Sequence, residues 1–191
     1  MLELFGKNLI NLLPGAIEKV TYQKKELTIY VHPSYITQVI FFLKMYINSK
    51  FQVLIDVCGA DYPKNAARFE VIYHLLSINY NARIRVKASI AENMPIDSIT
   101  SIFHSANWFE RETWDMYGIF FSNHNDLRRI LTDYGFEGHP LRKDFPLSGY
   151  TEVRYDAEKK RVVTEALELS QEYRAFDFTS PWENLINNND K

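Results

Sequence analysis

Apolar residues recur at two different spacings in the first part of the chain. Within residues 2–13 they lie three or four positions apart, which predicts a short amphipathic helix. Residues 17–22 and 27–31 are apolar runs on either side of a polar tetrapeptide, a pattern typical of a β-hairpin. Helical spacing returns over residues 34–47, where Ser34 follows a proline and is a candidate N-cap.

Three longer runs rich in Val, Ile, Phe and Tyr follow, separated by turn-forming residues, and they predict successive antiparallel strands. They cover residues 51–57, 69–77 and 82–90. Basic and apolar residues alternate strictly over residues 83–87. This predicts a strand with an apolar face toward a core and a basic face toward solvent or a partner. Residues 95–103 and 105–118 then read as two helices.

These elements predict an α+β fold, with a mostly antiparallel sheet that carries helices on one face and is followed by a long extended C-terminal arm. Regular periodicity fades after Gly118, and glycines and prolines interrupt the remaining apolar runs. So long an irregular stretch is unusual inside a compact domain. We therefore expect an α+β domain over residues 1–120 and a partner-binding arm over residues 121–191.

Composition narrows the class of function. A net charge of −2 and a pI near 6.2 offer no global electrostatic attraction to nucleic acid, which normally binds a basic face or stripe. The single cysteine, Cys58, cannot form an intrachain disulfide, and its apolar surroundings predict a buried, inert thiol. Because no apolar run approaches the length of a membrane span, we expect no direct crossing of a bilayer. Glu3 and Pro14 do not fit a targeting peptide.

Charge is concentrated in residues 110–149. On a helix, Arg111, Glu112 and Asp115 share one side, so we expect a charged face opposite an apolar face that packs on the core. The apolar side comprises Phe109, Thr113, Met116 and Phe120. Acid and base catalysis by paired carboxylates requires that the pKa values of the two groups differ. Charge pairs on helices are commonly structural, so the sequence does not favour catalysis by these carboxylates.

Other catalytic patterns are weak. The five histidines do not have zinc-ligand spacing, and no glycine-rich loop resembles a phosphate-binding loop. A free-standing enzyme would need Glu112, Asp115 and either His124 or His139 to converge in a pocket with shifted pKa values.

Basic residues in the arm alternate with apolar ones. Arg128 and Arg129 lie between leucines and an isoleucine, while Arg142 and Lys143 lie between a leucine and a phenylalanine. Such residues can bind a partner's carboxylates while the apolar neighbours fill pockets. Intrachain ion pairs that hold the arm on its own domain are an equal alternative.

Several strings in this region resemble the 30 kDa subunit of respiratory complex I, a family also called NADH dehydrogenase subunit 9, which has bacterial members. They are ERE at 110–112, DMYGI at 115–119, His124, LRRIL at 127–131 and GHPLRKDFPL at 138–147. The similarity continues through Glu152–Tyr155 and, more loosely, through residues 173–178 and Pro181-Trp182. The N-terminal half matches only in its pattern of elements.

The resemblance implies a core, cofactor-free structural and assembly subunit in the quinone-proximal module of the peripheral arm. Its expected partners are the large 49 kDa-type subunit and other peripheral-arm subunits. The whole complex is expected to carry FMN and iron–sulfur clusters, to transfer electrons from NADH to ubiquinone and to pump protons, while the isolated chain is inactive and holds no catalytic or metal-binding residue. The signature and interface residues implied are Glu110, Arg111, Glu112, Asp115, His124, Arg128, Arg129, Arg142, Lys143, Asp144 and Arg154.

The resemblance also implies a location. The chain lacks a recognisable transit peptide and is rich in residues that AT-rich genomes encode, which favours a mitochondrially encoded subunit on the matrix side of the inner membrane. The cytoplasmic face of a bacterial plasma membrane is the alternative. Related subunits of chloroplast-type NDH complexes and membrane-bound hydrogenases are alternative identities.

Overall fold

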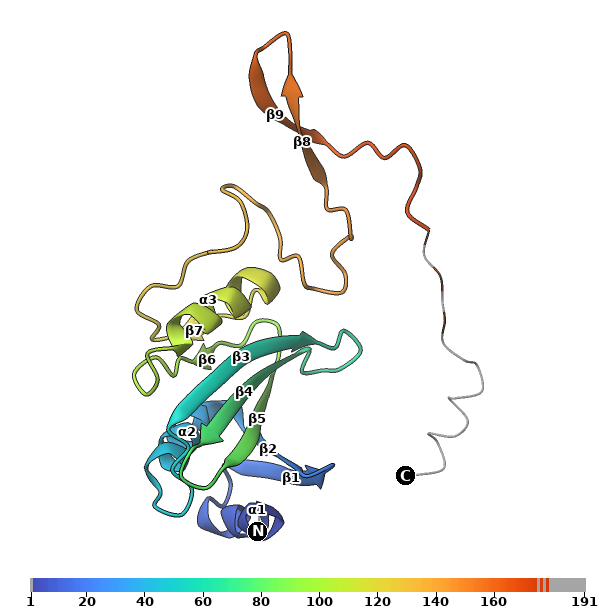
Figure 1. Cartoon of the computed structure of the whole chain (residues 1–191). Helices are drawn as coiled ribbons and strands as arrows, with labels where there is room; N and C mark the ends of the chain where they lie inside the picture. The colour runs from blue at the N-terminus through green and yellow to red at the C-terminus, as the bar shows by residue number, and fades with distance from the viewer. Residues whose placement is uncertain (1, 175, 177, 179–191) are drawn as a thin grey trace. The chain divides into compact units, whose positions relative to one another are not determined.

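The computed structural model describes residues 2–174, 176 and 178, and the chain divides into two compact units, Met1–Leu147 and Ser148–Lys191 (Figure 1). The boundary expected at residue 120 falls inside the first unit. The stretch from 121 to 147 therefore folds with the α+β domain. The resemblance at Pro181-Trp182 lies outside the described residues.

A five-stranded sheet forms the centre of the first unit, in the order β1-β2-β5-β4-β3. Its strands are β1 (Ile17–Gln23), β2 (Glu26–Val31), β3 (Val53–Asp61), β4 (Phe69–Ser77) and β5 (Ala82–Ile90). All neighbours are antiparallel except β2 and β5, which are parallel. The predicted hairpin, the three antiparallel strands and the α+β class are confirmed.

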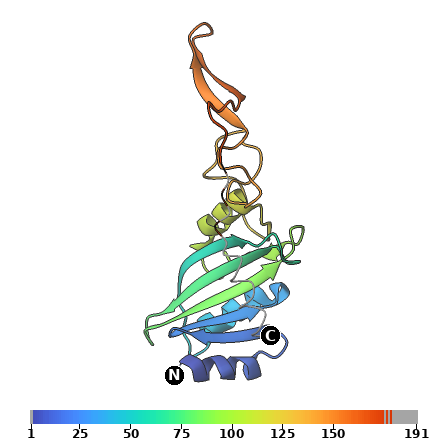
Figure 2. The ribbon, with the colours of Figure 1, turned by 90° about the vertical axis from the view of Figure 1, so that its right-hand side faces the viewer.

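Alternation of side chains decides which sheet face is buried. Every second residue of β4 is buried, and the intervening residues are half-buried. In β5, Ile84 and Val86 are buried, whereas Arg85 and Lys87 on the other face each pair with a carboxylate of a neighbouring strand at 2.9 Å. The predicted basic face exists, and these two basic groups are neutralised within the chain. Figure 2 shows this sheet face without a covering helix in the first unit.

Three α-helices accompany the sheet: α1 (Leu2–Leu12), α2 (Ile36–Met45) and α3 (Ala106–Tyr117). α1 packs beside the β1–β2 hairpin, and α3 packs on β3. The N-cap expected at Ser34 is wrong, because a 3-10 turn over Pro33–Tyr35 precedes α2. In that turn the backbone N–H of Ser34 donates to the ring of His32 at 3.4 Å.

The helix expected over residues 95–103 is also wrong. Ile96–Asp97 forms a short strand, β6, which pairs in parallel with β7 (Phe121–Ser122), and turns follow it. Buried Ile96, Ile99 and Phe103 imitate helical spacing. The backbone N–H of Ile99 instead donates to the carboxylate of Glu110 at 2.8 Å, so a tertiary hydrogen bond holds this segment outside a helix.

The second unit contains a hairpin that the sequence pattern did not predict. β8 (Thr151–Asp156) and β9 (Arg161–Ala166) are antiparallel and form a separate two-stranded sheet. The expected extended arm therefore includes regular structure. No helix in the described part of the chain has the length and apolar character needed to cross a bilayer.

The contact between α3 and β3 depends on a glycine. A Cβ added to Gly59 would lie 2.7 Å from the Tyr117 ring. We expect Gly59→Ala to lower the free energy of unfolding by about 1–3 kcal/mol, because the ring must move. In a Tyr117→Ala background the same change should cost much less, as a double-mutant cycle by denaturant unfolding would measure. An equal cost in both backgrounds would contradict this packing.

Candidate functional site

The charged side of α3 is divided, because Arg111 and Asp115 face inward and Glu112 is exposed. Glu110, Arg111 and Asp115 are buried, whereas Trp108 and Phe120 are 66% and 52% exposed. Of the apolar side expected to pack on the core, Thr113 is buried and Phe109 packs against the core, whereas Phe120 lies beyond the end of α3 and is exposed. The separation into a core face and a charged face therefore holds only in part, because Arg111 and Asp115 are buried as well. The physical reason is that two irregular segments supply hydrogen-bond donors to the carboxylates, and a buried charge is tolerated when it has such partners.

Asp115 holds the segment that follows β7. Its Oδ2 accepts hydrogen bonds from the backbone N–H groups of Ile130, Leu131 and Thr132 at 3.1, 2.8 and 2.9 Å. Its Oδ1 accepts from the Thr132 hydroxyl at 2.7 Å and from Arg129 Nη1 at 3.3 Å. Burial alone would raise the pKa of Asp115, but these hydrogen bonds hold it below its ordinary value.

Glu110 joins α3 to the segment after β6. Its carboxylate accepts from the Ser98 hydroxyl at 2.6 Å and from the Ile99 N–H at 2.8 Å. Burial raises the pKa of Glu110 to about 7, and the two hydrogen bonds only partly oppose this effect. The side chain is thus close to the balance between its neutral and charged forms near neutral pH.

His124 lies beside Glu110, with its Nε2 3.8 Å from Oε2 and both side chains fully buried. Its Nδ1 accepts a hydrogen bond from the Asp126 N–H at 3.0 Å. In the neutral ring the proton is therefore on Nε2, which lies 3.3 Å from the carbonyl oxygen of Asn107. His124 connects the end of β7 to α3.

Three further signature residues, Arg111, Glu112 and Arg128, make fewer hydrogen bonds with the rest of the domain. Arg128 is exposed and pairs with Asp126 at 2.8 Å. Its carbonyl oxygen accepts from Arg111 Nε at 3.3 Å, and the Arg111 guanidinium lies over the Trp108 ring. Glu112 is exposed on α3.

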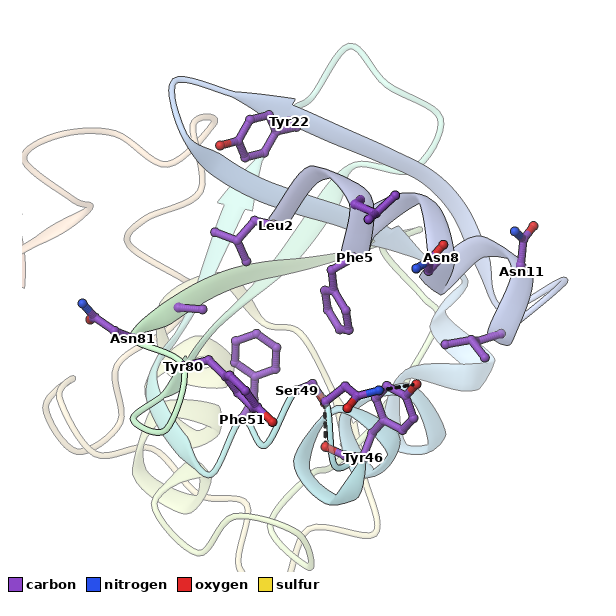
Figure 3. Close-up of a pocket in the computed structure, with 14 residues that line it drawn as sticks. Leu2, Phe5, Asn8, Asn11, Tyr22, Tyr46, Ser49, Phe51, Tyr80 and Asn81 are labelled. Carbon is purple, nitrogen blue, oxygen red and sulfur yellow. Dashed lines mark hydrogen bonds between the residues drawn. The ribbon is translucent and has the colours of Figure 1, made fainter.

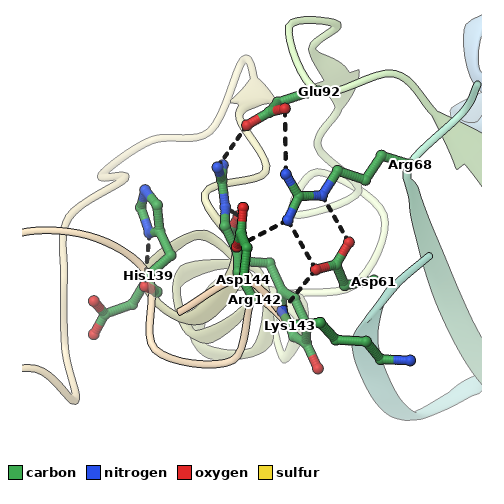
Figure 4. A network of polar contacts seen from close by, with 9 residues as sticks. Asp61, Arg68, Glu92, His139, Arg142, Lys143 and Asp144 are labelled. Carbon is green, nitrogen blue, oxygen red and sulfur yellow. Dashed lines mark hydrogen bonds and ion pairs between the residues drawn. The ribbon is translucent and has the colours of Figure 1, made fainter. Parts of the chain in front are cut away.

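The strap over residues 138–147 is tied to the domain by side chains and backbone groups (Figure 4). Arg142 donates to the carbonyl oxygen of Tyr117 and to the carboxylate of Glu92, both at 2.6 Å. His139 Nδ1 lies 2.9 Å from the carbonyl oxygen of Asp115. These contacts place the strap against the end of α3.

Asp61, at the end of β3, fixes the same strap. Its carboxylate accepts two hydrogen bonds from Arg68, at 2.8 and 3.0 Å, and one from the backbone N–H of Lys143 at 2.8 Å. Arg68 also pairs with Asp144 at 3.0 Å. The Arg68 hydrogen bond is the main cause that lowers the pKa of Asp61, while burial opposes it.

Arg154 lies outside this site, in the β8–β9 hairpin. It donates to both carboxylate oxygens of Glu165 at 2.6 and 2.7 Å. Of the two alternatives for the basic residues, intrachain pairs are therefore present for Arg128, Arg129, Arg142 and Arg154. Contact of these residues with a partner stays a prediction.

The acidic and imidazole groups of a free-standing enzyme line neither of two pockets in the described part of the chain. A groove of about 750 Å³ opens between α1, the loop after α2 and the β4–β5 turn (Figure 3). Leu4, Phe5, Tyr22, Tyr46 and Tyr80 are among the side chains that line it. Neither this groove nor the shallow pocket on the β8–β9 hairpin includes any residue proposed for acid or base chemistry.

Sequence reasoning missed the partners of the signature. Asp61, Arg68, Glu92 and Ser98 are dispersed over β3, the start of β4 and the segments beside β6, so no local spacing connects them with residues 110–147. The buried state of Glu110 had no signal in the helical pattern either.

The comparisons with known proteins agree with one another. Residues 29–151 match the family described as "Respiratory-chain NADH dehydrogenase, 30 Kd subunit". The chain is 55% identical over 184 residues to NADH-ubiquinone oxidoreductase subunit 9 of Reclinomonas americana, covering 96% of this chain and 90% of the relative. It is 59% identical over 183 residues to NADH dehydrogenase [ubiquinone] iron-sulfur protein 3 of Marchantia polymorpha, covering 96% and 94%.

A bacterial relative and a solved structure extend the comparison. A subunit of the NADH-quinone oxidoreductase of Rhodospirillum rubrum is 53% identical over 184 residues, covering 96% of this chain and 86% of the relative. A chain of the membrane-bound sulfane sulfur reductase, an archaeal respiratory membrane complex, aligns with a TM-score of 0.65 over 76% of this chain and 85% of that chain. At 23% identity, this likeness shows the fold alone.

Replacing Asp115 by Asn keeps the shape of the side chain but removes its charge. The side-chain NH2 group of Asn would then face backbone N–H groups, and two donors cannot form a hydrogen bond with each other. We expect the free energy of unfolding at pH 7 to fall by about 2–4 kcal/mol. Asp126→Asn, which alters the exposed pair with Arg128, is the control and should cost less than about 1 kcal/mol. Equal losses in denaturant unfolding would disprove the role of Asp115.

The raised pKa of Glu110 predicts that the free energy of unfolding falls as pH rises. Its folded pKa of about 7 lies above the ordinary 4.5, so its contribution to stability is complete below about pH 4.5 and is lost as pH rises through 7. Glu110→Gln removes this titration. Between pH 5 and 8, wild type should lose about 2–3 kcal/mol of unfolding free energy relative to this variant. Glu112→Gln, on the exposed side of α3, is the control; a constant difference would contradict the assignment.

Proposed function

This chain belongs to the 30 kDa subunit family of respiratory-chain NADH dehydrogenase, and we propose that it is a core structural subunit of an NADH–ubiquinone oxidoreductase. It stands in the quinone-proximal module of the peripheral arm, beside a large 49 kDa-type subunit. Its second unit binds neighbouring subunits. Identities of 53–59% with relatives named as subunits of such oxidoreductases, over nearly the whole chain, support this assignment.

The observation that carries the binding role is the exposed apolar face of the β8–β9 hairpin. The strand register places Val153 opposite Thr164 and Tyr155 opposite Val162, so these four side chains share one face. Val153, Tyr155 and Val162 are 62%, 63% and 64% exposed. Thr151 and Ala166, which pair at the open end of the hairpin, complete this face.

The other face of the hairpin carries charge. Arg154 and Glu165 form a bidentate pair there, and Asp156 accepts hydrogen bonds from the backbone of the connecting turn. The hairpin is thus amphipathic, although it belongs to a two-stranded sheet that has no further strand in the described residues.

A two-stranded hairpin is marginally stable by itself in water. Full burial of a Val or similar apolar side chain contributes about 1.5–3 kcal/mol. Covering the apolar face with another subunit therefore supplies stability that the described residues of the second unit do not obtain from buried apolar side chains of their own. This supports an arm that becomes fully stable on assembly.

The chain does not fit an iron–sulfur cluster, although some relatives carry "iron-sulfur protein" in their names. Clusters are held by several cysteine thiolates, and Cys58 is the only cysteine of the sequence. Cys58 is half-buried, and burial raises the pKa of its thiol, which disfavours the thiolate. Over the described residues, no group of three or more His, Cys, Asp or Glu side chains is placed to bind a metal ion.

Electron transfer from NADH to ubiquinone accordingly takes place on cofactors held by other subunits, namely FMN and iron–sulfur clusters. The chain contributes shape and attachment, and by itself it is inactive. The coupled complex translocates protons. Its place is the matrix side of the mitochondrial inner membrane, or the cytoplasmic face of the plasma membrane if the source is bacterial.

A second candidate is the equivalent subunit of another membrane complex, such as a chloroplast-type NDH or a membrane-bound hydrogenase. The shared fold with the archaeal sulfane sulfur reductase chain shows that this fold also occurs in a membrane complex of another kind, and it does not by itself favour either candidate. Identification of co-purifying subunits decides between them: an NADH-oxidising module supports the first candidate, and a nickel–iron large subunit or a ferredoxin-binding set supports the second.

The hairpin face gives a direct test. We expect Val153→Ser combined with Val162→Ser to weaken association with the complex at least tenfold, because the loss of two buried valine side chains exceeds the roughly 1.4 kcal/mol that corresponds to a tenfold change. Native electrophoresis would measure the intact complex in cells that express the variant in place of wild type. Glu158→Gln in the connecting turn is the control. Normal amounts of complex with the serine variant, or NADH–quinone reduction by the purified chain alone, would overturn the proposal.

A further inference from the structure

Tyr134 is fully exposed, with a relative accessibility of 102%. It occupies the tip of a loop over residues 129–138 in the first unit, and Leu131 in the same loop is 58% exposed. Large aromatic side chains are usually buried at least in part, because each removes substantial apolar area from water. A tyrosine that contacts so little of its own domain calls for a physical explanation.

The base of the loop is closed by polar contacts. Arg129 Nη1 donates to the carbonyl oxygen of Gly138 at 2.9 Å and so joins the two ends of the loop. The buried carboxylate of Asp115 binds the backbone N–H groups of residues 130–132. Compact loops whose ends are held together in this way are frequently functional.

The tip is ordered as well. Asp133 Oδ1 accepts from the Tyr134 N–H at 2.8 Å, and the Asp133 carbonyl oxygen accepts from the Phe136 N–H at 3.2 Å. Gly135 has a φ of +74°, which a turn at this point requires. The Phe136 ring packs against Phe145 of the strap, with 5.9 Å between centroids. Contacts within the chain thus hold the conformation that presents Tyr134.

Pre-ordering matters because binding is weakened by the entropy lost when a loop becomes ordered. Tyrosine adds a large contact area with few rotatable bonds, and it is enriched among the residues that dominate binding energy. A rigid loop with an exposed tyrosine at its tip thus has the properties of an interface anchor.

Charge around the tip indicates what kind of pocket fits it. Arg129 is neutralised by Asp115, and Arg128 by Asp126. The remaining charged residues of the loop are Asp133 and Glu137, both exposed and on either side of Tyr134 in the sequence. An acidic tip is repelled by anionic lipid headgroups and by nucleic acid.

We infer that residues 129–138 form an anchor loop whose Tyr134 inserts into a pocket of another protein subunit, apolar at its base and rimmed by Lys or Arg. This inference rests on the proposed function, since the partner is a subunit of the same complex. The anchor loop belongs to the folded domain and is a second attachment, separate in sequence from the apolar face of the β8–β9 hairpin.

A photo-crosslinking phenylalanine analogue at position 134 tests the contact directly. The full chain that carries it replaces wild type in cells, and the native complex is irradiated and separated. We expect one covalent adduct with a single other subunit, at a site that peptide mapping places beside Lys or Arg. The same analogue at position 78, an exposed apolar position in the β4–β5 turn, is the control. Adducts with lipid only, or none with protein, would overturn the inference.

Variants measure how much the anchor contributes. Tyr134→Ala should reduce the chain's incorporation into the complex tenfold or more, while Ile78→Ala leaves it unchanged and both variants keep the thermal unfolding temperature of wild type. Tyr134→Phe, which keeps the ring, should restore most of the incorporation. Asp133→Asn with Glu137→Gln should reduce the dependence of incorporation on salt. Wild-type incorporation by Tyr134→Ala would contradict the anchor role.

The two proposals fail in different ways. If the hairpin variant impairs assembly but Tyr134→Ala does not, the anchor loop is disproved and the structural role of the chain stands. If wild-type chain is absent from the native NADH–ubiquinone oxidoreductase, the proposed function fails. In that case an adduct from position 134 with a subunit of another complex would still support the anchor loop.

Discussion

The buried carboxylate of Asp115 is the interaction on which the signature region depends. One helical side chain accepts hydrogen bonds from three successive backbone N–H groups, a hydroxyl and a guanidinium. In a half-buried segment without helix or strand, the backbone groups that are removed from water must find partners elsewhere. Asp115 supplies them, and the irregular chain after β7 becomes part of the domain as a result.

A second set of contacts holds the strap over residues 138–147. Asp61 and Arg68 lie at neighbouring ends of β3 and β4, and they bind the backbone and side chains of the strap, while Arg142 reaches the end of α3. Much of the charge that looked available for partners is therefore used within the chain. The two surfaces proposed to contact partners, the hairpin face and the tip at Tyr134, are apolar or aromatic.

This division of roles fits a structural subunit of a large complex. The charged groups give the domain a defined shape, because buried polar networks stabilise one arrangement when every member is paired. The exposed apolar side chains then provide the area that association between subunits buries. In the role proposed for this chain, shape and attachment are thus carried by different residues.

The sequence by itself determined the sheet strands, because alternation such as Ile84 and Val86 against Arg85 and Lys87 follows from the local geometry of a strand. It also determined the family, through the strings between 110 and 147. Only the tertiary structure decided that Glu110 and Asp115 are buried and that residues 95–103 are not a helix. Those outcomes depend on hydrogen bonds between segments far apart in the chain, which local spacing does not encode.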